Sequence, residues 1–195
     1  MRIRAMMFAL AATAAMGIGA SGASAATLFT TSAHTTTVAT GSAVSATATS
    51  PVVLTSATSA LNTCSSSSLA GTVTTNSGGT VAGNITSGSV SSCAPFSAGV
   101  TFPSAWVLSV TGSSTTSGST TIWSNVTISN VRFDLNNGPY SGTLSGGITA
   151  RQPHSGGPIC LQLSDSGTLT GPLTGNGRID TNYCFNGAAA NYSLG

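Results

Sequence analysis

Residues 69–85 read Leu-Ala-Gly-Thr-Val-Thr-Thr-Asn-Ser-Gly-Gly-Thr-Val-Ala-Gly-Asn-Ile. On each side of the central Asn76–Gly79 segment, apolar residues alternate with small or polar ones. Alternation with a period of two predicts a half-buried strand. Asn and Gly tolerate the positive φ angles of a tight turn. The stretch therefore predicts a β-hairpin, and its pattern recurs along the chain.

No segment shows a helical period, and the helix formers Glu and Lys are absent from the sequence. Residues 111–120 are predicted to form a Ser/Thr/Gly loop, and Asn136–Pro139 a turn. A change of phase after Ile128 predicts a β-bulge near Ser129 or Asn130. Strands are expected at Trp106–Val110, Ile122–Leu135, Leu144–Ile148, Ile159–Leu163, Ile179–Phe185 and Tyr192–Leu194. We predict an all-β fold of about eight to ten strands, an antiparallel β-sandwich or alternatively a small β-barrel.

The N-terminus has the order of a secretory signal peptide. Arg2 and Arg4 precede the apolar stretch Ala5–Ala20, and Ala23-Ser24-Ala25 follows with small residues at the spacing that signal peptidase recognises. The apolar stretch is too short and too rich in Ala and Gly for a membrane span. We expect cleavage after Ala25, no transmembrane segment in the mature chain, and a secreted or cell-surface protein.

The formal net charge of +2 belongs to this N-terminal segment, because Arg2 and Arg4 account for it. From residue 26 on, three Arg residues balance three Asp residues. Nucleic-acid binding needs several cations on one face, so we expect no nucleic-acid partner. More than a third of residues 26–195 are Ser or Thr, which predicts a neutral, hydroxyl-rich surface.

The four cysteines, Cys64, Cys93, Cys160 and Cys184, favour disulfides in an exported chain. They form no C-x-x-C pair, and both histidines are distant in sequence, so no metal site is expected. Three pairings are possible. We favour Cys64–Cys93 and Cys160–Cys184, because each closes one local loop.

The predicted organisation has three parts. Residues 1–25 form the signal peptide. Residues 26–59, dominated by Ala, Ser and Thr, are expected to be loosely structured or to form edge strands. Residues 60–195 are expected to form the disulfide-stapled β domain.

Three short motifs carry a resemblance: Phe102-Pro103-x-x-Trp106-Val-Leu, Asn130-Val-Arg-Phe133 and Ser141-Gly-Thr-Leu-Ser-Gly. With these motifs and a cysteine pair in each half, the chain from Leu61 onward resembles a family of small exported bacterial proteins, many from actinobacteria. It is also similar to the secreted alkane-oxidation activator proteins of pseudomonads. The resemblance implies an exported all-β protein and supplies no catalytic residues.

Residues that recognise a ligand are few. Trp106 and Trp123 would stack on a sugar or an apolar ligand if exposed, although such aromatics more often anchor a core. The segment Arg151–Pro158, with Arg151 and His154, is the most site-like loop. Composition also allows a Ser-His-Asp site from His154 and Asp165, but no G-x-S-x-G motif accompanies it.

These observations predict a protein without catalytic residues or cofactor. The first hypothesis is a structural, adhesive or matrix protein that associates with itself or with cell-envelope components. Its basis is the neutral surface and the lack of lysine to protect edge strands. The alternative is a small extracellular binding module for a carbohydrate or an apolar ligand.

Overall fold

The computed structural model describes residues 25–56, 59–135, 138–171 and 177–195; the predicted signal peptide, apart from Ala25, lies outside them. The elements are β1 (Leu28–Phe29), β2 (Ala43–Ala48), β3 (Val52–Ser56), β4 (Ser59–Ser77), β5 (Thr80–Ala94), β6 (Ala98–Val100), β7 (Trp106–Ser117), β8 (Thr120–Leu135), β9 (Gly138–Ser145), β10 (Ile148–Pro153), β11 (Cys160–Thr170), β12 (Gly177–Phe185), the 3-10 helix η1 (Gly187–Asn191) and β13 (Ser193–Leu194).

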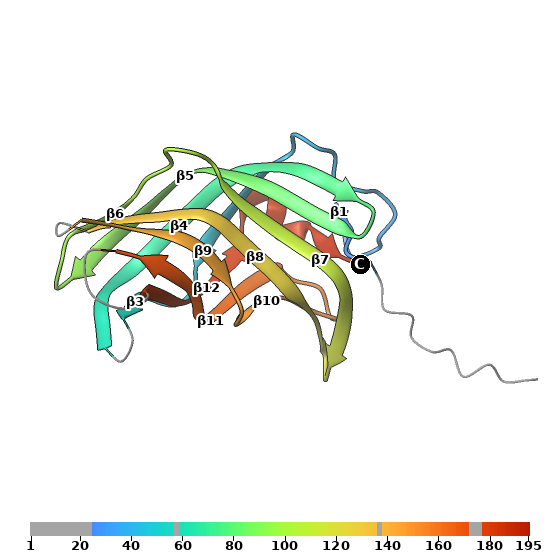
Figure 1. Ribbon diagram of the computed structural model, residues 1–195. Coiled ribbons are helices and arrows are strands. Elements are labelled where there is room, and N and C mark those ends of the chain that lie inside the picture. The colour runs from blue at the N-terminus through green and yellow to red at the C-terminus, as the bar shows by residue number, and fades with distance from the viewer. Residues whose placement is uncertain (1–24, 57–58, 136–137, 172–176) are drawn as a thin grey trace, which may run out of the picture.

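The long strands form a ring in which neighbours in sequence are neighbours in space. β2 and β3 together occupy one strand position of the ring, one after the other, since both pair with β4 and β12. In the same way β9 and β10 both pair with β8 and β11. The order is therefore β2/β3, β4, β5, β7, β8, β9/β10, β11, β12 and back to β2/β3, with every pair antiparallel. Figure 1 shows β4, β5, β7 and β8 arching over β3, β10, β11 and β12.

This architecture confirms the all-β antiparallel fold and both favoured disulfides. The ring-like hydrogen bonding corresponds to the barrel alternative more closely than to two separate sheets. One stretch of the ring is left open, because residues 87–94 of β5 pair with β4 alone.

The predicted hairpin is confirmed as β4 and β5. Ser77 pairs with Thr80 across a two-residue turn in which Gly78 and Gly79 have φ of 61° and 76°. Positive φ at both positions matches the twist of a β-hairpin, and glycine adopts it without the steric penalty that a Cβ atom would cause. The bulge is confirmed as well, since the register of β8 against β9 shifts between Ile128 and Val131.

Two expected segments differ from the structure. Residues 111–120 are not a loop, because β7 continues to Ser117 and β8 begins at Thr120 after a turn at Gly118 and Ser119. Thr is β-branched and fits an exposed strand as well as a loop. The strand expected at Leu144–Ile148 is broken at Gly146 and Gly147, both with positive φ. The predicted turn at Asn136–Pro139 lies partly outside the described residues.

The segment 26–59 also differs from its expectation. β2 and β3 are hydrogen-bonded on both sides, by β4 and β12, so they are neither loose nor edge strands. The chain before them is fixed by Asn76, which accepts a hydrogen bond from Leu28 N at 2.7 Å and donates one to Val38 O at 2.9 Å. Small residues suffice here because partners on both sides supply the backbone hydrogen bonds.

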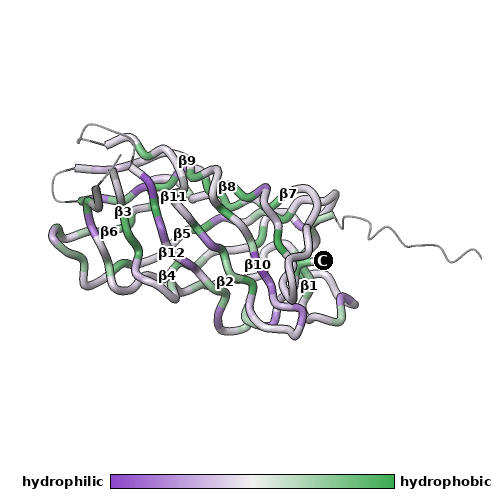
Figure 2. The backbone as a smooth tube through the Cα atoms, turned by 90° about the horizontal axis from the view of Figure 1, so that it is seen from below, coloured by the Kyte–Doolittle hydropathy of each residue, from purple (hydrophilic) through white to green (hydrophobic). Residues whose placement is uncertain are grey.

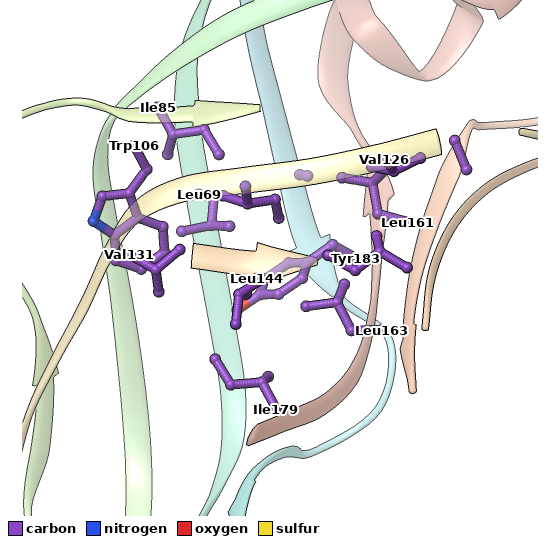
Figure 3. Packing of buried hydrophobic residues seen from close by; sticks show 14 of the residues in the cluster. Leu69, Ile85, Trp106, Val126, Val131, Leu144, Leu161, Leu163, Ile179 and Tyr183 are labelled. Carbon is purple, nitrogen blue, oxygen red and sulfur yellow. The ribbon is translucent and has the colours of Figure 1, made fainter. Parts of the chain in front are cut away.

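The core fills the space between the two layers. Figure 3 shows Leu69, Ile85 and Trp106 from one side of the ring facing Leu163, Ile179 and Tyr183 from the other. Cys64 lies directly opposite Cys93 in the β4–β5 ladder, and Cys160 directly opposite Cys184 in the β11–β12 ladder. Each layer therefore carries one disulfide.

Most of the chain has intermediate hydropathy. Figure 2 shows a pale tube over most of the chain, with purple limited to short stretches. Among the described residues, no helix combines the length and the apolar character required to cross a membrane.

Candidate functional site

The two tryptophans are core residues. Trp106 is 2% exposed and Trp123 is fully buried. The Trp106 ring packs between Phe102 and Phe133, with ring centroids 4.9 and 5.6 Å away, and its Nε1 donates to Thr101 O. Neither tryptophan presents a face to a ligand in this structure.

Arg151 and His154 lie on or just after β10 and are both exposed. Arg151 Nε donates to Thr149 Oγ1 at 3.2 Å, so this arginine points along its own strand. His154 Nε2 lies 2.9 Å from Thr121 Oγ1 of β8. The hydrogen-bond partner of His154 is therefore a threonine. The Ser-His-Asp site that composition allowed also needs the side chain of Asp165, which lies outside the described residues.

His154 lines a cleft of about 180 Å³ that we call the histidine cleft. Its walls include His34, Thr121, Gln152, His154 and Ser193. His34 stacks on Phe29 with ring centroids 4.6 Å apart. The two histidines of the chain, 120 positions apart, therefore face one cleft.

Sequence reasoning missed Thr121 and His34 as members of this cleft, and it included Gln152 only as a part of the segment Arg151–Pro158. One signal was present: Gln152 and His154 are two positions apart, and such residues share a face where the backbone is extended. The segment Arg151–Pro158 was expected to be a loop, whereas β10 continues to Pro153. Nothing in the sequence indicates that β8 runs beside them, or that residue 34 returns to this end of the ring.

A second cavity lies inside the ring and is almost wholly apolar. We call this the interior cavity; its volume is about 40 Å³. Side chains that line it are Val44, Ala46, Leu69, Ile85, Leu108, Ile128, Leu161, Tyr183 and Phe185. Gly71 also lines it, and a Cβ there would collide with the carbonyl oxygen of Asn84, so a larger residue is excluded.

Tyr183 is the polar exception in the lining of the interior cavity. Its hydroxyl lies 2.7 Å from Ser67 Oγ, and both side chains are buried. Burial raises the pKa of Tyr183 to about 12, although the Ser67 hydrogen bond acts in the opposite direction. The phenol is therefore neutral at physiological pH and serves as a hydrogen-bonding group.

The outer surface of β4, β5, β7 and β8 carries hydroxyl and amide groups in rows across the strands. We call it the hydroxyl face. Ser66 and Ser91 hydroxyls lie 2.6 Å apart, and those of Ser68 and Ser89 lie 2.9 Å apart. Further rows run through Ser109 and Thr127, and through Thr80, Thr111 and Asn125. No charged residue occurs in these rows.

One ion pair lies beyond the hydroxyl face, near the end of β8. Arg132 Nε lies 2.9 Å from Asp134 Oδ1, as expected from their positions on one strand face. Asp134 also accepts a hydrogen bond from Thr101. Since both of its oxygens have partners, Asp134 is better suited to fixing the segment before Trp106 than to acid–base chemistry.

Together these features define an all-β protein with a ring-like antiparallel sheet and one disulfide per layer. Comparison with protein families, curated proteins and solved structures finds no match to this chain. The resemblance to exported bacterial proteins therefore stays a prediction from its short motifs.

Proposed function

We propose that this chain is a non-enzymatic protein of the cell surface or extracellular space, with a structural or adhesive role. The observation that carries the proposal is the hydroxyl face. Rows of Ser, Thr and Asn side chains cover four adjacent strands, whose neighbours are about 4.8 Å apart in any sheet. Such an array offers many hydrogen bonds and no charge, which suits uncharged hydroxylated partners such as polysaccharides.

The open stretch of β5 supports association between copies. Residues 87–94 pair on one side only, and none of them is charged. Natural edge strands are usually protected by charge, proline or a bulge. The sequence predicted unprotected edge strands, and closure of the ring pairs most of them on both sides. The open stretch of β5 is therefore where a second copy would add a strand.

The test is binding of the purified protein to insoluble neutral polysaccharides at low and high salt. We expect retention that high salt does not weaken, because screening acts only on charges. The double variant Ser89→Arg/Thr127→Arg places two charges on the hydroxyl face and should lose retention. Thr47→Arg/Thr143→Arg places the same charge on exposed threonines elsewhere and should not.

The same variants test self-association. Wild type is expected to form oligomers at high concentration, and Ser89→Arg to reduce them through charge on the open edge. A strictly monomeric wild type that also ignores polysaccharide and hydrocarbon surfaces would contradict the structural and adhesive role.

The interior cavity favours a second candidate, binding of a small apolar ligand. A cavity of about 150 Å³ holds benzene, so a cavity of about 40 Å³ suits only a narrow aliphatic group. Ala46→Leu should fill this space and remove any stabilisation by xenon or short alkanes. Ala48→Leu, on the same strand but outside the lining, is the matched control. Thermal unfolding with and without gas measures the effect, and an unchanged wild-type Tm would exclude this candidate.

A further inference from the structure

The histidine cleft brings three groups together on the inner face of two neighbouring strands. Thr121 of β8 lies directly opposite Gln152 of β10 in the antiparallel ladder. Directly opposite residues project to the same face, with Cβ atoms about 5 Å apart. His154 follows two positions after Gln152, and its Nε2 lies 2.9 Å from Thr121 Oγ1. The hydroxyl and the imidazole are therefore in contact, and the carboxamide of Gln152 lines the same cleft.

The carboxamide of Gln152 is held in one orientation. Its Oε1 accepts a hydrogen bond from Leu194 N at 2.8 Å, and its Nε2 donates to Gly157 O and Tyr192 O, both at 3.1 Å. Only 7% of the residue is exposed. The backbone N–H of Leu194 polarises the amide carbonyl and would stabilise negative charge on its oxygen, as in an oxyanion hole.

From this geometry we infer that Thr121 and Gln152 become joined by an intramolecular ester bond, formed once per chain with His154 as the base. His154 Nε2 takes the proton of the Thr121 hydroxyl while Oγ1 attacks Cδ of Gln152. The tetrahedral oxygen is held by Leu194 N. The Cδ–Nε2 bond then breaks, the imidazolium returns its proton to the leaving nitrogen, and one ammonia departs. The balance requires no oxidant, metal or other reactant.

The fold supplies the two conditions that such a weak nucleophile needs. An adjacent base activates the hydroxyl. Because the fold holds the two reacting groups side by side, the reaction is effectively unimolecular. The activation barrier then no longer includes the translational and rotational entropy of bringing two molecules together. The product would tie β8 to β10, strands that neither disulfide connects. This cross-link is independent of the proposed adhesive role.

The test uses the purified wild-type chain with its disulfides intact. We expect an intact mass lower, by one ammonia, than the sequence with two disulfides requires. Trypsin cleaves after Arg132 and Arg151, which separates Thr121 from Gln152. After reduction, the peptide ending at Arg132 and the peptide starting at Gln152 should remain joined, and mild alkali should separate them.

Variants distinguish the ester from other losses of ammonia. Thr121→Val should show the full mass and no joined peptide, Thr121→Ser should restore the joined peptide, and the neighbouring Thr120→Val should behave as wild type. His154→Ala should slow formation about 100-fold, the usual contribution of a general base. Full wild-type mass, or a mass loss without the joined peptide, would overturn the inference.

Discussion

The inside of the ring is apolar at its middle and polar at the end near β10, although one strand serves both regions. On β8, Ile128 lines the interior cavity and Thr121 lines the histidine cleft. Both residues face inward although they are seven positions apart, because the alternation of β8 shifts between Trp123 and Val126, where two consecutive residues are exposed. Position along the strand decides their chemistry: the lining of the interior cavity is almost wholly apolar, whereas the cleft around Thr121 is also lined by His34, Gln152, His154 and Ser193.

The two regions satisfy their buried groups differently. In the interior cavity most lining side chains have no polar atom and need no partner. In the histidine cleft every buried polar side chain has one: Gln152 makes three hydrogen bonds, and Ser193 Oγ donates to Thr31 O at 2.6 Å. Packing therefore stabilises the middle of the ring, and directional bonds attach the termini to its end.

The largest effect is expected in the apolar region. Ile128→Ala removes buried methyl groups and enlarges the interior cavity, so the free energy of unfolding should fall by about 4 kcal/mol. Urea unfolding with the disulfides intact measures it. A loss below about 1 kcal/mol would show that the neighbouring residues collapse into the space and that the middle is loosely packed.

A somewhat smaller effect should come from the polar group within the apolar lining. The phenol of Tyr183 ionises near pH 10 in the unfolded chain and near pH 12 in the folded one. The folded pKa is raised, so its contribution is complete below pH 10. Stability should then fall by roughly 3 kcal/mol as the pH rises from about 10 to 12.

The control for this pH dependence is the double variant Ser67→Ala/Tyr183→Phe, which removes the phenol without leaving an unpaired serine. Its free energy of unfolding should lack the alkaline loss. An equal loss in wild type and double variant would assign the effect to groups other than Tyr183.

In the polar region a single bond should matter less. Ser193→Ala removes the hydrogen bond to Thr31 and should cost about 1 kcal/mol. Amide hydrogen exchange should accelerate for residues around Thr31 but not for the core strands. If exchange rises throughout the ring, the histidine cleft and the interior cavity unfold as one unit.

The smallest effect is expected on the hydroxyl face. Thr127→Ala changes an exposed side chain between two inward-facing core residues, and its effect on the free energy of unfolding should stay below about 0.5 kcal/mol. Urea unfolding of Thr127→Ala and Ile128→Ala under the same conditions compares the two losses in the free energy of unfolding directly. A cost above 1 kcal/mol would mean that the hydroxyl rows themselves stabilise the sheet.

Local features were predictable because their causes are local. The Gly78–Gly79 turn sets the register of the first hairpin, and Asn130, with φ of 60°, sits in the predicted bulge. The segment 111–120 was mispredicted because composition was taken as a sign of a loop. In a chain where Ser and Thr are abundant on the outside of the long strands, hydroxyl content does not distinguish strands from loops.

The candidate sites were less predictable. The interior cavity results from side chains on strands far apart in sequence, and no single window shows it. Trp106 and Trp123 were candidate ligand platforms if exposed, with a core position as the more frequent outcome for such aromatics; both lie in the core, because large aromatics gain more by burial than by exposure.

The sequence by itself determined the all-β fold and its first hairpin and favoured both disulfides, because tight turns place adjacent segments side by side and local loops are the cheapest to close. Only the tertiary structure decided that β12 returns to β2 and β3, and that His34 meets His154. Those contacts depend on which apolar faces remain uncovered once all the hairpins have formed. Alternation within a strand says that a face must be buried, but not against which partner.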